Sequence, residues 1–311
     1  MQSMMTVMNQ VVIMMILIAV GFVMTKRGMI TEKGTGEITT LLLRIVTPCL
    51  IVNSLLGVDE PPALGELAMA MLCPALAIVI AMLISWAFFK KEPIDRKKVL
   101  RFSVTFSNAG FMGLPLVQGI VGPHGVVLGS FFVVVFNLIC WTYGYGMMSG
   151  GKPNVKAALL NPGVIGLVIG LPLCFAGLDL PSFVTQPIAL LANLNTPLAM
   201  LVIGSYVARV HLKDFLTDSG IYLMAFLRLV AAPGLFLLVL MLLRPERDLF
   251  LSSAIQASSA VAANAVLFAV EYHGDSKLAS GTVAISTLFS IITIPTFALL
   301  AQLACQALKI S

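Results

Sequence analysis

The stretch FSNAGFMGLPL, residues 106 to 116, lies where an uninterrupted membrane helix would be expected. Its flanks are apolar, yet it holds Asn108, Gly110, Gly113 and Pro115 close together. Glycine weakens a helix, and proline removes a backbone donor and clashes with the preceding turn. The amide of Asn108 adds a polar group at the same place. The stretch therefore predicts a helix that is broken inside the hydrocarbon layer.

The composition of the whole chain is that of an integral membrane protein. Of its 311 residues, 59% are hydrophobic and 11% are charged, and the mean hydropathy is +1.01. Soluble domains carry about 25% charged residues. Apolar runs long enough to cross about 30 Å of hydrocarbon recur from end to end. We therefore expect an all-α polytopic protein that forms one membrane domain.

Hydropathy predicts ten transmembrane helices. The first run lacks a basic leader and a small-residue cleavage site, so we expect a retained helix rather than a signal peptide. The ten segments span residues 6 to 24, 37 to 56, 67 to 89, 102 to 120, 125 to 148, 163 to 178, 185 to 208, 219 to 243, 249 to 270 and 278 to 305.

Basic residues are concentrated in alternate connections between these segments. Fourteen of the 19 Lys and Arg residues lie in the odd-numbered connections, whereas the even ones hold only Arg244 and Arg247. The positive-inside rule then places the odd loops in the cytoplasm and both termini outside a cell membrane. The net charge of +5 is explained by this topology, and no nucleic-acid partner is expected.

Five segments followed by five more give two halves of opposite orientation, which predicts inverted repeats. The first repeat covers residues 1 to 148, a cytoplasmic linker covers 149 to 162, and the second repeat covers 163 to 311. LLLRIVTPCLIVNSL (41 to 55) resembles LLANLNTPLAMLVIG (190 to 204), and an offset of 152 aligns Ser107 with Ser259. These matches are few, so the opposite orientation of the halves is the stronger argument.

At this offset the core of the opening stretch falls within ASSAVAANAVL, residues 257 to 267, which is also rich in small and polar residues. Two helices that unwind near mid-span would direct the positive ends of their dipoles at one cavity, an arrangement that suits an anion. Close helix packing through small residues is the alternative explanation. The expected substrate-binding residues are Asn108, Gly110, Gly113, Pro115, Ser259, Asn264, Asn195 and Asn53.

Two arginines, Arg44 and Arg228, lie well inside expected spans. Buried ionisable residues are costly and are often functional, so each is a candidate anion partner or gate. Pairing with carbonyl groups, or reaching the lipid phosphates, is the alternative for each. No Asp or Glu falls clearly inside a span, which argues against a sodium/proton antiporter. The coupling ion, proton or sodium, stays open.

The cysteines and histidines give no sign of a metal or cofactor site. The cysteines lie scattered in apolar segments without CxxC spacing, which predicts free thiols. The histidines are expected in loops, where a lone histidine is usually solvated. The cysteines are Cys49, Cys73, Cys140, Cys174 and Cys305, and the histidines are His124, His211 and His273.

Three stretches resemble the auxin efflux carrier family, which includes the plant PIN carriers and bacterial malonate and malate permeases. They are FSNAGFMGLPLVQGIVG (106 to 122), LLLRIVTPCLIVNSLL (41 to 56) and the region from 264 to 300 with its Phe-Ala-x-Glu-Tyr run. The resemblance implies two inverted five-helix repeats with crossed, broken helices 4 and 9, as in sodium/proton antiporters or bile-acid symporters. It also implies a scaffold domain beside a transport domain, elevator-type alternating access, a homodimer and a carboxylate substrate.

Within this resemblance, Asn108 matches the family's substrate-site asparagine and Pro115 matches its crossover proline. The second crossover departs from the plant pattern, because Ala262, Ala263 and Asn264 stand where a proline is expected. Only the location of that second site is therefore carried over. The long hydrophilic loop of the plant carriers is also missing.

The expected function is secondary active transport of small organic anions, such as malonate or malate, by a protein embedded in membrane lipid. An auxin-like monocarboxylate efflux carrier is the first alternative, and a membrane channel or sensor is the alternative of another class. No enzyme is expected, because the chain has neither GxGD nor GxSG paired with a mid-span histidine.

Overall fold

The computed structural model describes residues 2–57, 63–151, 156, 159–160, 162–176, 180–209, 218–272 and 274–310. Within these ranges the chain is helical, and its one contact of β type is an antiparallel bridge between Ser107 and Val261. The prediction of an all-α protein is confirmed. His211, His273 and half of the expected linker lie outside the described residues.

The first half of the chain alternates α-helices with short π-helical turns, labelled η. Its elements are α1 (Gln2–Lys26), α2 (Glu32–Leu41), η1 (Leu42–Val46), α3 (Thr47–Leu56), α4 (Leu64–Ala87), α5 (Ile94–Thr105), η2 (Ala109–Gly113), α6 (Leu114–Ile120), α7 (Pro123–Ile139), η3 (Cys140–Gly144) and α8 (Tyr145–Ser149).

The second half continues in the same manner. Its elements are α10 (Pro162–Ala176), α11 (Ser182–Asn193), α12 (Asn195–Arg209), α13 (Ser219–Phe226), η5 (Leu227–Ala231), α14 (Ala232–Leu243), α15 (Arg247–Ala257), α16 (Asn264–Glu271) and α17 (Ser276–Leu308).

Six continuous helical stretches in the described chain are long and apolar enough to cross a membrane. They are Glu32–Leu56, Leu64–Ala87, Pro123–Ser149, Ser182–Arg209, Ser219–Leu243 and Ser276–Leu308. Shorter apolar helices cover Val12–Lys26, Ala109–Ile120 and Pro162–Ala176. A polytopic membrane protein is thereby supported, whereas the count of ten spans and the inverted repeat stay predictions.

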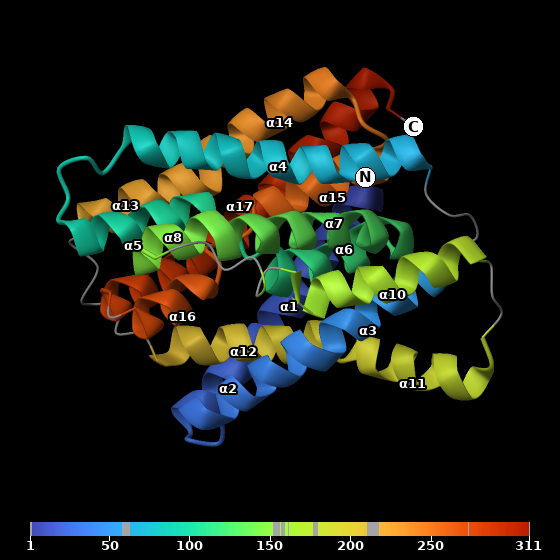
Figure 1. Ribbon diagram of the computed structural model, residues 1–311, viewed down its shortest axis with the longest axis horizontal. Helices are drawn as coiled ribbons and strands as arrows, with labels where there is room; N and C mark the ends of the chain where they lie inside the picture. The colour runs from blue at the N-terminus through green and yellow to red at the C-terminus, as the bar shows by residue number, and fades with distance from the viewer. Residues whose placement is uncertain are drawn as a thin grey trace.

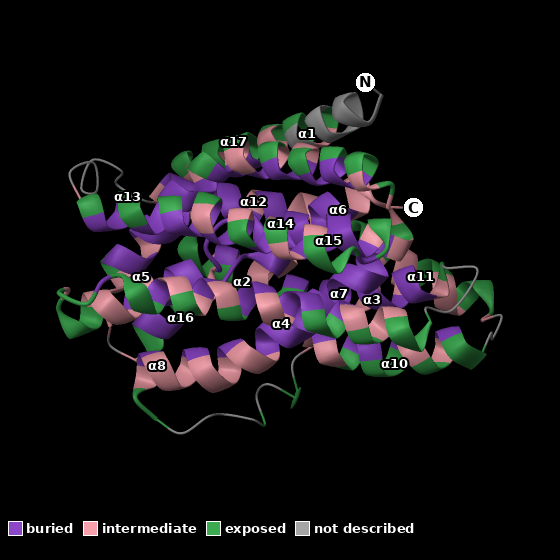
Figure 2. Cartoon of the chain, turned by 90° about the horizontal axis from the view of Figure 1, so that it is seen from above, coloured by how far each residue is buried: buried purple, intermediate pink, exposed green. Residues whose placement is uncertain are grey.

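The helices pack in two groups, each drawn from both halves of the chain. One group contains α1, α2, α3, α10, α11 and α12, and the other contains α4 to α8 and α13 to α17. Figure 1 shows α2, α3, α11 and α12 along the lower edge and α4 and α14 along the upper edge. Helix α7 is buried along most of its length, whereas the outer helices expose many residues (Figure 2). Element η2 contacts α12 of the first group as well as α7 and α15 of the second.

Three of the π-helical turns end shortly before a proline. Elements η1, η2 and η5 each end two residues before Pro48, Pro115 or Pro233. Proline has no N–H, and its ring collides with the carbonyl one turn back, so a regular α-helix cannot run through it undisturbed. A widened turn moves that carbonyl away and lets the helix continue. These prolines therefore widen their helices without ending them.

Candidate functional site

Both predicted helix breaks are present, and they meet at one crossover. Helix α5 ends at Thr105 and η2 begins at Ala109, while α15 ends at Ala257 and α16 begins at Asn264. The two intervening segments run antiparallel. The Asn108 N–H donates to the Ala260 carbonyl at 2.8 Å, and the Ala262 N–H donates to the Phe106 carbonyl at 3.0 Å.

This pairing satisfies backbone groups that the breaks would otherwise leave without partners. An unpaired N–H or C=O deep in the protein would cost free energy, and lipid supplies no partner. A third element contributes, because the hydroxyl oxygen of Ser286 in α17 accepts from the Val261 N–H at 3.0 Å. The crossover is thus closed by backbone pairing and by one side chain of α17.

The first break includes Asn108 but lies upstream of the two glycines and the proline that also predicted it. Residues 106 to 108 are the non-helical ones, whereas Gly110, Gly113 and Pro115 lie inside the helix that follows. Pro115 does not itself end a helix, because it stands in the first turn of α6. A missing N–H does little harm there, and η2 makes room for the ring.

Arg228 lies at the crossover and binds the ends of both incoming half-helices. Its Nη1 donates to the carbonyls of Val104 at 3.0 Å and Thr105 at 3.4 Å, and its Nη2 donates to the Ala257 carbonyl. These are the last carbonyls of α5 and α15, where the helix dipoles are negative. Arg228 is buried, with 3% of its surface exposed. Arg228 is therefore paired with carbonyl groups of the chain, and its role as an anion partner or gate stays a prediction.

Arg44 has a different environment. It is exposed on η1, between the exposed side chains of Leu43 and Ile45. Element η1 packs against α2, α3, α10, α11 and α12, all outside the crossover helices. Both arginines lie well inside their expected spans, yet the structure buries Arg228 at the crossover and leaves Arg44 exposed away from it.

Asn108 is the last residue of the first break and stands at the N-cap of η2, directly before its first helical residue. Its carbonyl accepts from the N–H groups of Met112 and Gly113, yet its side chain does not cap the helix. Asn108 is buried, with 7% of its surface exposed. The side-chain amide of Asn108 therefore accepts no hydrogen bond from the first N–H groups of η2.

Gly110 and Gly113 face different surroundings. A methyl group added at Gly110 would meet no atom within 4 Å. The same group at Gly113 would lie 2.7 Å from Cγ and 3.2 Å from Cα of Gln256. Gly113 therefore allows α15 to pack closely against η2, as in the alternative explanation that small residues serve helix packing. Gly110, in contrast, borders open space beside Asn108.

Gln256 is a crossover residue that the sequence analysis missed. Its Nε2 donates to the carbonyls of Gly129 at 3.0 Å and Ala109 at 3.4 Å, while its Oε1 is buried without a partner. A glutamine inside an apolar helix was a usable signal, as was Ser286.

The remaining predicted residues divide between the crossover and its surroundings. Ser259 is buried in the second break and donates to the Ile255 carbonyl at 3.1 Å. Asn264 begins α16 and donates to Cys140 Sγ at 3.8 Å. Asn195 is buried at the start of α12, which packs against η2, and its Nδ2 has no partner. Asn53 is half-buried in α3, which packs mainly against α10 and α11.

The contact between the two helix groups beside η2 is lined by methionines. A pocket of about 20 Å³ lies there among α1, η2, α6, α12 and α17, with Met14, Met15, Met112, Met200 and Ser290 in its wall. That volume holds about one water molecule. Methionine is unbranched and flexible, so this contact can repack.

The crossover combines donor groups and positive potential. Donors are present in the Asn108 amide and at the start of η2, while the Arg228 charge offsets the two carboxyl-terminal helix ends. Such a site can hold an anion and offers no set of metal ligands. The cysteines Cys49, Cys73, Cys140, Cys174 and Cys305 are all free, as predicted.

Comparison with known proteins assigns the family. The membrane transport protein family matches residues 6–298. An uncharacterized transporter of Methanothermobacter thermautotrophicus is 25% identical over 297 residues, covering 90% of this chain and 94% of that protein. An uncharacterized transporter of Methanocaldococcus jannaschii is 25% identical over 305 residues, covering 92% and 96%. The chain therefore belongs to the membrane transport protein family, which is the auxin efflux carrier family that its sequence resembles.

Proposed function

We propose that this protein is a secondary transporter of small organic anions and that it binds the substrate carboxylate at the crossover. Carboxylates such as malonate or malate are the proposed substrates. The observation that carries the proposal is the start of η2, where the uncommitted Asn108 amide lies beside the open side of Gly110. A helix amino end of this kind attracts negative charge.

The proposed movement is alternating access of the elevator type. The helices that form the crossover belong to one packing group, and η2 touches α12 of the other group. A displacement of one group along the other would carry the site between the two sides of the membrane. The methionine-lined contact beside η2 supports this proposal, because flexible side chains can repack during such a displacement.

A homodimer embedded in lipid is the proposed assembly, with proton or sodium as the coupling ion. An auxin-like monocarboxylate is the second substrate class, since one carboxylate is sufficient for the proposed contact. A channel or sensor is the alternative of another class, and saturable exchange distinguishes it from a carrier.

Counterflow in proteoliposomes tests the proposal, because exchange needs no knowledge of the driving ion. We expect saturable exchange of labelled malonate or malate by the wild type and its loss in Asn108→Ala. Asn9→Ala is the matched control, because Asn9 is an exposed asparagine of α1. Undiminished exchange by folded Asn108→Ala would contradict the site. Flux that does not saturate would contradict a carrier.

A further inference from the structure

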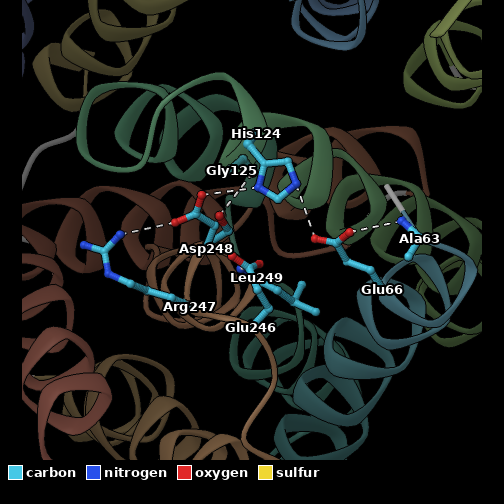
Figure 3. A network of polar contacts seen from close by, with 9 residues as sticks. Ala63, Glu66, His124, Gly125, Glu246, Arg247, Asp248 and Leu249 are labelled. Carbon is cyan, nitrogen blue, oxygen red and sulfur yellow. Dashed lines mark hydrogen bonds and ion pairs between the residues drawn. The ribbon is translucent and has the colours of Figure 1, made fainter. Parts of the chain in front are cut away.

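A second polar cluster joins the first turns of three helices away from the crossover. His124 of α7 lies between Glu66 of α4 and Asp248 of α15 (Figure 3). Its Nε2 is 3.3 Å from Glu66 Oε1, and its Nδ1 is 3.3 Å from Asp248 Oδ2. The expectation that His124 is a lone solvated loop histidine is therefore wrong.

Glu246 completes the cluster. One ligand atom from each of Glu66, His124 and Glu246 lies within 4.8 Å of the others. Partial burial raises the pKa of the Glu246 carboxyl. The cluster holds three carboxylates, and among the described residues Arg247 is the arginine ion-paired with them.

The remaining atoms of the acidic residues already have partners. Glu66 Oε2 accepts from the Ala63 N–H at 3.2 Å, which leaves Oε1 directed at His124. Glu246 Oε2 accepts from the Leu249 N–H at 3.4 Å. Asp248 is occupied on both oxygens, because Oδ1 accepts from Arg247 and Oδ2 faces His124 Nδ1.

These contacts suit one tautomer of a neutral imidazole, the one in which Nδ1 carries the proton. With its Nδ1 proton donated to Asp248, a neutral His124 presents the Nε2 lone pair to Glu66 Oε1. Two acceptors 3.3 Å apart need a proton or a metal ion between them. A carboxylate that holds the far nitrogen of a ligand histidine is the usual outer partner in protein metal sites.

We propose that Glu66, His124 and Glu246 bind a divalent transition-metal ion of the zinc class, with Asp248 as the residue that orients His124. Zinc bonds of about 2.0 to 2.1 Å in a tetrahedron place neighbouring ligand atoms about 3.3 to 3.4 Å apart, which agrees with the Glu66–His124 distance. Two carboxylate ligands and a neutral histidine balance a doubly charged ion, and water fills the fourth position. Side-chain exposures of 33% for His124 and 18% for Glu66 leave a path for entry.

Such an ion would join α4, α7 and α15 at one end of the molecule. Helix α15 runs from this cluster directly to the second break, since it begins at Arg247 and ends at Ala257. The metal would therefore stabilise the helix that leads into the crossover. This proposal is independent of the substrate, and its test needs no transport measurement.

Titration of the purified, chelator-stripped full chain in detergent with Co²⁺, followed by competition with Zn²⁺, tests the site. We expect one ion per chain, with the visible absorption of tetrahedral cobalt in an oxygen and nitrogen environment. His124→Gln and Glu66→Gln should abolish that absorption. Asp248→Asn should weaken affinity about 10- to 100-fold and keep the absorption, because it loses only the outer partner.

Glu37→Gln is the matched control, since Glu37 pairs only with Lys33 on an exposed face of α2. It should bind cobalt as the wild type does, and thermal unfolding should verify that every variant is folded. Absence of binding by the wild type, or equal binding by folded His124→Gln, would overturn the proposal. The cluster would then be a proton-bridged network. Thiolate absorption bands would overturn it as well, because they would assign the ion to cysteine.

Discussion

Gly110 and Gly113 lie on one helix, three residues apart, and a single methyl group distinguishes their roles. Gly113→Ala should lower the free energy of unfolding by about 1 to 3 kcal/mol, because the new carbon collides with Gln256 and must displace α15. Gly110→Ala should leave stability nearly unchanged, because its methyl group meets open space. Thermal unfolding in detergent measures both.

The same pair also tests the proposed substrate site. If the space beside Gly110 receives the carboxylate, Gly110→Ala should raise the substrate concentration needed for half-maximal counterflow while the protein stays folded. Unchanged counterflow kinetics in Gly110→Ala would place the substrate elsewhere.

Arg228 and Arg44 form a second matched pair. Arg228→Met should cost about 3 kcal/mol or more, because the buried carbonyls of α5 and α15 lose their donor. Arg44→Met should change stability by about 0.5 kcal/mol or less, because Arg44 is exposed. Denaturation of the two variants side by side measures the difference, and equal losses would contradict the assignment of Arg228 to the crossover.

At the scale of elements, the pairing of the two breaks is directly testable. Ser107 and Val261 form the narrow type of antiparallel pair, in which the Cα atoms lie about 4.5 Å apart, close enough for a disulfide. In a background without the native cysteines, Ser107→Cys with Val261→Cys should therefore cross-link on mild oxidation.

Mass spectrometry of digested protein detects that cross-link. Ser107→Cys with Val270→Cys is the control, because Val270 is exposed on α16. Equal cross-linking of both pairs, or of neither, would argue against the antiparallel crossover.

The breaks themselves were predictable because small and polar residues interrupt otherwise apolar segments. The exact position of the first break was not predictable. Pro115 is accommodated by the widened turn η2 and does not mark the end of a helix. The partners of Arg228 were also hidden from sequence reasoning. They lie 124 and 29 residues away in the chain, and only the meeting of the two helix breaks brings them together.

The His124 cluster could not be predicted from the sequence for the same reason, namely that its members are distant in the chain. Its members come from three separate helix starts, with 124 residues between His124 and Asp248. None of the spacings forms a local motif, so each residue taken alone resembles an ordinary loop residue. Composition and hydropathy, in contrast, are sums over the chain, which is why they predicted a helical membrane protein correctly.

For the whole molecule, the charge asymmetry predicts orientation. A tag at either terminus of the protein in intact cells should react with a membrane-impermeant reagent, and cysteines placed at Lys97 or Lys98 should not. Basic loops are retained on the cytoplasmic side, and these two lysines lie in the most basic connection. Labelling of the lysine positions but not of the termini would reverse the predicted topology.

The backbone bridge at the crossover has a mechanical consequence. Since the two broken helices share hydrogen bonds, and one arginine holds both of their ends, neither can shift without the other. The crossover then behaves as a single rigid part, and flexibility is left to the methionine contact around Met112 and Met200. Under the proposed function, substitutions in that contact would alter the speed of turnover, whereas substitutions in the bridge would alter whether the protein holds its shape.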